Sequence, residues 1–130
     1  MNQICIYTTS EDSKEFHPNN SSSDFTVELP ETLHLKGDWV IALTEIYTLE
    51  EISVPILILC DICEQSIHEG KLKPILKLIY PDCIQFSNIH YIPIKNRNIN
   101  RIRFLIKDGV TGKDILSQKI SLSLHLLQRQ

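Results

Sequence analysis

Hydrophobic and polar residues alternate with a period of two in four stretches of the chain. The apolar positions of these stretches are Phe25, Val27 and Leu29; Trp39, Ile41 and Leu43; Ile102, Phe104 and Ile106; and Ile120, Leu122, Leu124 and Leu126. Because successive side chains of a strand point to opposite faces, this period predicts strands that are buried on one side only. We expect Pro30 to end the first strand, since proline has no N–H to give to a sheet.

Weaker patterns raise the expected number to about eight antiparallel strands. They cover residues 4–8, 55–61, 75–80 and 90–94. No sustained stripe of 3.6-residue period predicts a long helix. The polar segment 10–23 is expected to be a surface loop with at most one helical turn, shaped by side-chain-to-backbone hydrogen bonds of Asn19 and Asn20. The pattern therefore predicts an all-β sandwich.

The alternation also predicts which side chains form the core. The expected core anchors are Phe25, Leu29, Trp39, Leu43, Phe104, Leu122 and Leu124. Glu45 falls on the same alternating face as Trp39 and Leu43. It is therefore expected either at the edge of the core, at an interface with a basic partner, or at the exposed end of its strand.

Length and composition fit one soluble domain covering residues 1–130. The chain has 130 residues, of which 42% are hydrophobic, enough for one core and too few for two. Its start lacks the basic and apolar regions of a signal peptide. Its longest apolar run, residues 54–60, is far too short to span a bilayer. We expect a soluble protein made in the cytoplasm, not secreted through a signal peptide, with no membrane contact.

Charge is divided unevenly between the two halves of the sequence. Residues 1–69 contain thirteen acidic and two basic residues, a net charge of −11, whereas residues 70–130 contain three acidic and eleven basic residues, a net charge of +8. If the halves form different surfaces, copies would attract one another head to tail, and their assembly would weaken as salt rises. If the halves interleave in one sandwich, the charges are balanced within each subunit.

The basic residues near the third alternating stretch form a second candidate surface. Arg101, Arg103 and Lys107 fall on one strand face, with Lys95 and Arg97 nearby. This stripe suits a solvated strand face and, together with Glu45, contact with other subunits equally well. It also suits contact with nucleic acid, which the acidic net charge of −3 makes the less favoured interpretation.

No catalytic pattern stands out, and the protein is not expected to be an enzyme or to need a cofactor or metal. Cys60-x-x-Cys63 is the one motif that requires a test. A redox site needs its first cysteine at a helix N-terminus, and a zinc site would have to recruit Cys83 and His90 at irregular spacing. Buried thiols are the favoured interpretation.

Three motifs in order resemble a known family. They are Pro18-Asn19-Asn20, the run Phe25-Thr26-Val27-Glu28-Leu29-Pro30, and Leu33-His34-Leu35-Lys36-Gly37-Asp38-Trp39 continuing to Glu45-Ile46. The chain resembles the small minor capsid (penton-type) proteins of Polinton/Maverick elements and related DNA viruses such as adintoviruses and adomaviruses. The later strands are also similar, through His90 to Ile94 and Ile102 to Asp108. One departure is that only residues 47–54 separate two strands that are far apart in relatives.

The resemblance implies a single jelly-roll β-sandwich and a place in a virion. It implies self-association, in a pentameric ring at the vertices of the shell, and contact with the major capsid protein. Two alternatives stay open from the residues alone: a β-sandwich binding module or adaptor with no shell role, and a thiol or zinc protein that uses Cys60 and Cys63.

Overall fold

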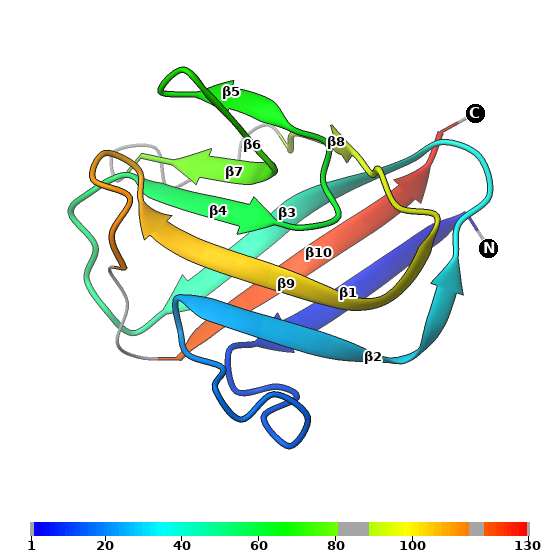
Figure 1. The fold of residues 1–130 in the computed structure, drawn as a ribbon, viewed down its shortest axis with the longest axis horizontal. Helices are drawn as coiled ribbons and strands as arrows, with labels where there is room; N and C mark the ends of the chain where they lie inside the picture. The colour runs from blue at the N-terminus through cyan, green and yellow to red at the C-terminus, as the bar shows by residue number, and fades with distance from the viewer. Residues whose placement is uncertain (1, 81–88, 115–118, 130) are drawn as a thin grey trace.

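The computed structural model describes residues 2–80, 89–114 and 119–129, which contain strands and turns but no helix. The first sheet has the order β1 (Gln3–Thr9), β10 (Ile120–Gln128), β3 (Trp39–Thr48) and β8 (Ile92–Pro93). The second has the order β2 (Asp24–His34), β9 (Asn98–Asp108), β4 (Ile56–Cys60) and β7 (Ile75–Ile79). A separate hairpin consists of β5 (Ser66–His68) and β6 (Lys71–Lys73). Figure 1 shows the two sheets packed face to face, with the hairpin beyond β4 and β7.

The chain passes between the sheets in a nested order. β1 pairs with β10 and β2 pairs with β9, so in each sheet the strand that comes first along the chain lies beside the strand that comes last. All neighbouring strands are antiparallel. Eight strands in two four-stranded sheets with this nested connection are typical of a jelly roll. The expectation of an all-β, jelly-roll-like sandwich of antiparallel sheets is confirmed.

The core lies between the sheets and contains most of the anchors expected from the alternation. Six of them are at most 6% exposed: Phe25, Trp39, Leu43, Phe104, Leu122 and Leu124. Phe25 and Phe104 are direct cross-strand partners, and their ring centroids lie 5.4 Å apart. Leu29 is only half-buried and packs against the rim of this cluster. It follows Glu28, where the regular pairing of β2 with β9 stops.

Pro30 does not end its strand, contrary to expectation. β2 continues to His34, and the pairing with β9 is interrupted between Glu28 and Leu33. Pro30 is exposed and lies within this interruption. A proline is tolerated there because the ladder requires no N–H from it.

A β-bulge in β3 changes the face on which Glu45 lies. Leu43 pairs with Leu124 and Glu45 pairs with Ser123, so Thr44 is an extra residue between two pairs. Its hydroxyl donates a hydrogen bond to the Ser123 carbonyl at 3.0 Å. A bulge shifts the alternation by one residue. Beyond the bulge, Ile46 packs against the core and Glu45 is exposed. The expectation that Glu45 lies on the same face as Trp39 is therefore wrong. Glu45 instead has the exposed position that was the alternative.

Two local features complete the fold. The β5–β6 hairpin, which the pattern did not predict, turns at Glu69 and Gly70, with φ angles of 53° and 73°. Such a pair of left-handed residues is typical of a tight hairpin turn. In segment 10–16 the N–H groups of Phe16 and His17 both donate to the Ser13 carbonyl, at 3.0 and 2.8 Å, in one turn. No helix that could span a membrane occurs in the residues described.

Candidate interaction surfaces

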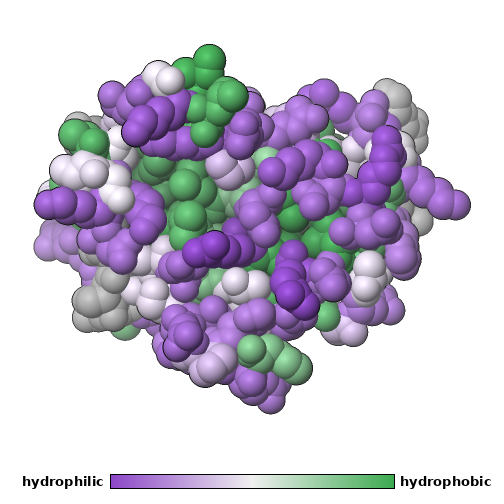
Figure 2. All heavy atoms as spheres, viewed as in Figure 1, coloured by the Kyte–Doolittle hydropathy of each residue, from purple (hydrophilic) through white to green (hydrophobic). Residues whose placement is uncertain are grey.

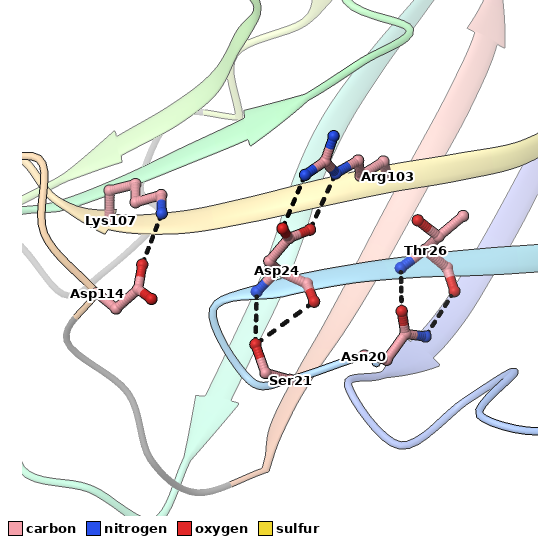
Figure 3. A network of polar contacts seen from close by, with 7 residues as sticks. All are labelled: Asn20, Ser21, Asp24, Thr26, Arg103, Lys107 and Asp114. Atoms are coloured by element: carbon pink, nitrogen blue, oxygen red, sulfur yellow. Dashed lines mark hydrogen bonds and ion pairs between the residues drawn. The ribbon is translucent and has the colours of Figure 1, made fainter. Parts of the chain in front are cut away.

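Arg103, expected at an interface, is held by an acid of its own chain. β2 and β9 are neighbours, so the Asp24 carboxylate lies beside the guanidinium group and accepts hydrogen bonds from Nε at 2.9 Å and from the terminal nitrogen at 2.7 Å (Figure 3). The hydrogen bond from Arg103 lowers the pKa of Asp24 below its ordinary value. Such a bidentate ion pair fixes the geometry of both side chains.

The other two bases of this stripe are also paired with acids of their own chain, each through one contact. The Nε atom of Arg101 lies 3.1 Å from a carboxylate oxygen of Glu28, and the Nζ atom of Lys107 lies 2.6 Å from Asp114. Asp24 and Glu28 come from the acidic half of the sequence and Arg101 and Arg103 from the basic half. At this surface, therefore, the interleaved halves balance their charges within one subunit.

The segment 10–23 covers the free edge of β2 along its first part, residues 24–28. The Asn20 side chain accepts a hydrogen bond from the Thr26 N–H at 3.0 Å and donates one to the Thr26 carbonyl at 2.9 Å (Figure 3). The Ser13 hydroxyl accepts a hydrogen bond from the Glu28 N–H at 2.8 Å. These side chains replace the neighbouring strand that an edge lacks. The sequence indicated a loop shaped by Asn20, but not that the loop would seal a sheet edge.

A row of three hydrogen-bonded side chains, which the alternation did not predict, crosses the outer face of the first sheet. His125 is the imidazole between Tyr91 and Gln3: its Nδ1 lies 2.8 Å from the Tyr91 hydroxyl, and its Nε2 lies 2.9 Å from the Gln3 side-chain oxygen. Ala42, the cross-strand partner of His125, has no exposed surface. Through these two hydrogen bonds, His125 of β10 links Gln3 of β1 to Tyr91, the residue before β8. The only signal of this row in the sequence was the one histidine among the outward-facing residues of β10.

Cys60 and Cys63 are brought together but are buried. The Cys63 N–H donates to the Cys60 carbonyl at 3.1 Å in the turn after β4, and neither side chain has any exposed surface. Burial, followed by the hydrogen bond with the Cys63 thiol, raises the pKa of the Cys60 thiol well above its ordinary value. Little thiolate is then present to attack a substrate or bind a metal. This favours the buried-thiol interpretation.

The proposed zinc ligands do not form a cluster within the described part of the chain. His90 is exposed, and Cys83 lies outside the described residues. Within the described ranges, no three histidine, cysteine or acidic side chains are grouped so that they could hold a metal ion.

Large apolar side chains are exposed at two further places. Ile67 and Leu72 are cross-strand partners on the β5–β6 hairpin and are 75% and 64% exposed. Where β3 leaves the sheet, Tyr47 and Leu49 are 62% and 73% exposed, and Tyr47 lines a hollow of about 410 Å³ with apolar walls. Figure 2 shows apolar atoms over the hairpin and in a recess beside it, surrounded by hydrophilic side chains. Apolar side chains gathered in this way are typical of protein contact surfaces.

In comparisons with known proteins, no family model matches the chain and no curated protein matches it significantly.

Proposed function

We propose that this protein is a non-catalytic coat subunit, a minor capsid protein of the penton type, which associates with copies of itself and with a major capsid protein in a virion. The observation that carries the proposal is the nested strand order, β1-β10-β3-β8 packed on β2-β9-β4-β7. Viral coat proteins commonly have this jelly-roll connection. The motifs from Pro18 to Ile46 add a resemblance in sequence.

The distribution of side chains suits a building block. The chemically notable groups are either used internally, as in the pair Asp24–Arg103, or buried, as in Cys60 and Cys63. Exposed apolar residues stand on a hairpin and at a strand end, where a neighbouring subunit could cover them. Contacts of this kind generate rings when they are repeated around an axis.

Mass spectrometry of particles purified from cells that carry the gene tests the proposal. We expect peptides of this chain to co-purify with the major coat protein in a fixed ratio, and electron microscopy of the purified chain to show closed rings. A chain that is absent from particles and strictly monomeric would contradict the proposal and favour an adaptor role.

A further inference from the structure

Among the residues that the structure describes, the strand β1 has backbone groups without a partner. The Ser10 N–H donates to the Ile120 carbonyl at one end of the strand, and the Gln128 N–H donates to the Asn2 carbonyl at the other, both at 2.9 Å. Hydrogen-bonded pairs alternate along an antiparallel ladder. The even-numbered residues of β1 therefore point their backbone groups at β10, and the odd-numbered residues point theirs at the free edge.

Of these odd-numbered residues, the last is the one whose backbone is bonded by another described residue. The Thr9 N–H donates to the Asp12 carboxylate at 3.2 Å, and the Asp12 N–H donates to the Thr9 carbonyl at 3.1 Å. In the described ranges, no residue offers a hydrogen bond to the backbone of Gln3, Cys5 or Tyr7. All three are exposed, Tyr7 by 76%. As far as the described residues show, this edge is thus open at three residues, whereas on the edge of β2 the backbone of Thr26 and Glu28 is bonded by Asn20 and Ser13.

The open edge also lacks the usual protection against pairing. Exposed edge strands commonly carry a charge, a proline or a bulge that prevents addition of another strand. Residues 2–10 contain no charged residue and no proline, and β1 pairs with β10 without a register shift. Isoleucine, tyrosine and threonine, which fill most of β1, are good strand formers. Two such strands would meet without repulsion between like charges.

We propose that the free edge of β1 pairs antiparallel with β1 of a second copy across a two-fold axis, joining their two four-stranded sheets into one. The inference rests on the proposed function, because it assigns a contact between copies; this contact is distinct from the ring contact, since a two-fold pairing closes with two copies and would join copies from two different rings. The open groups fix the register. If Cys5 lies opposite the partner's Cys5, then Gln3 lies opposite the partner's Tyr7, and every open N–H and C=O gains a hydrogen bond. A shift centred on Ile6 would instead direct Gln3 at Thr9, which Asp12 already occupies.

This register also completes the burial of two core-facing side chains. Ile4 and Ile6 are only partly buried and pack against the rim of the core. With Cys5 on the two-fold axis, Ile4 faces the partner's Ile6 in a close cross-strand pair. The apolar layers of the two copies would then meet along the joined sheet.

Two edge variants test the pairing under reducing conditions. Cys5→Pro removes an N–H that the ladder to β10 does not use, and edge strands tolerate proline at such a position. Tyr7→Lys adds a charge to a side chain that is already exposed, so folding is retained even if the proline variant unfolds. In light scattering or sedimentation, we expect either variant to weaken self-association at least tenfold. The matched control Cys5→Ser should associate like the wild type.

Cross-linking tests the register itself. Directly opposed hydrogen-bonded residues have Cα atoms about 5.5 Å apart, within the range that a disulfide spans. In the Cys83→Ser background, diamide should take two electrons and two protons from the paired Cys5 thiols and yield a Cys5–Cys5 dimer. Peptide mass spectrometry identifies the link, and Cys5→Ser should abolish it.

The outcomes separate the inference from the proposed function. If the edge variants assemble as well as the wild type, or if rising salt abolishes assembly, the edge pairing is overturned and the coat role stands. If the wild-type chain stays monomeric at every concentration, the edge pairing is also overturned, and the presence of the chain in particles decides the coat role.

Discussion

Asn20 and Thr26 are joined as residues of two neighbouring strands would be, with the side-chain amide of Asn20 holding both backbone groups of Thr26, at 3.0 and 2.9 Å. Asn20→Ala leaves both groups without this partner at a partly buried edge. We expect a loss of about 1–2 kcal/mol in the free energy of unfolding, measured with urea. The exposed neighbour gives the control: Asn19→Ala should change stability little. Equal losses for the two variants would contradict the sealing role.

The Asp24–Arg103 pair should stabilise the fold in a pH-dependent way. The folded-state pKa of Asp24 is lowered, chiefly by its hydrogen bond with Arg103. For an acid with a depressed folded pKa, the stabilisation is present above the unfolded value and is lost as pH falls through the folded value. At neutral pH, Asp24→Asn should therefore cost about 0.5–1 kcal/mol, as expected for a partly exposed pair.

A double-mutant cycle with Arg103→Gln isolates this contribution. The coupling between the two positions should be measurable at pH 7, shrink in high salt, and vanish at a pH below the folded pKa of Asp24. A coupling energy that persists in strong acid would show that packing, not charge, links the two side chains.

The bulge at Thr44 makes Ile46, not Glu45, the residue that supports the core. Ile46→Ala removes apolar surface that packs against the buried cluster and should cost about 1–3 kcal/mol. Glu45→Ala, at the exposed neighbour, should stay within about 0.5 kcal/mol. Thermal unfolding of both variants checks the order. The reverse order would mean that β3 keeps strict alternation past Leu43.

Phe104 should be among the side chains most important for stability, because it has no exposed surface and lies 5.4 Å from Phe25. Phe104→Ala should lower the free energy of unfolding by about 3–5 kcal/mol. Phe16 provides the same substitution at a position that is 64% exposed. Phe16→Ala should be close to neutral in the same denaturant titration, and a comparable loss would place Phe16 in a contact that its exposure does not indicate.

Alternation along the sequence predicted the faces of strands far better than their pairing. It placed Phe25 and Phe104 inside, but their direct opposition depends on register, which the period of two does not specify. It could not predict the shift at Thr44, because one extra residue reverses the face of every residue after it. The prediction that Pro30 ends its strand was wrong because a proline interrupts a ladder only where an N–H is needed for a hydrogen bond.

The candidate surfaces were predicted less well. Arg101 and Arg103 were correctly placed on an outer strand face, but their pairing with Glu28 and Asp24 follows from β2 lying beside β9. Asn20 was expected to bond backbone within its loop, and its side chain does donate to the Asp12 carbonyl at 3.3 Å; its two bonds to Thr26 on a strand edge were not predicted. The sequence did not predict the open edge of β1. An uncharged run of residues was its one sign, because whether an edge is open depends on where the other segments of the chain lie.

Residue-resolved hydrogen exchange tests most directly the claim that the chain seals one sandwich edge and leaves the other for a second copy. The amides of Thr26 and Glu28 should be protected at every protein concentration. Those of Cys5 and Tyr7 should exchange rapidly in dilute solution and become protected as concentration rises. Rapid exchange at Cys5 and Tyr7 at all concentrations, or protection that persists in the isolated monomer, would contradict the account.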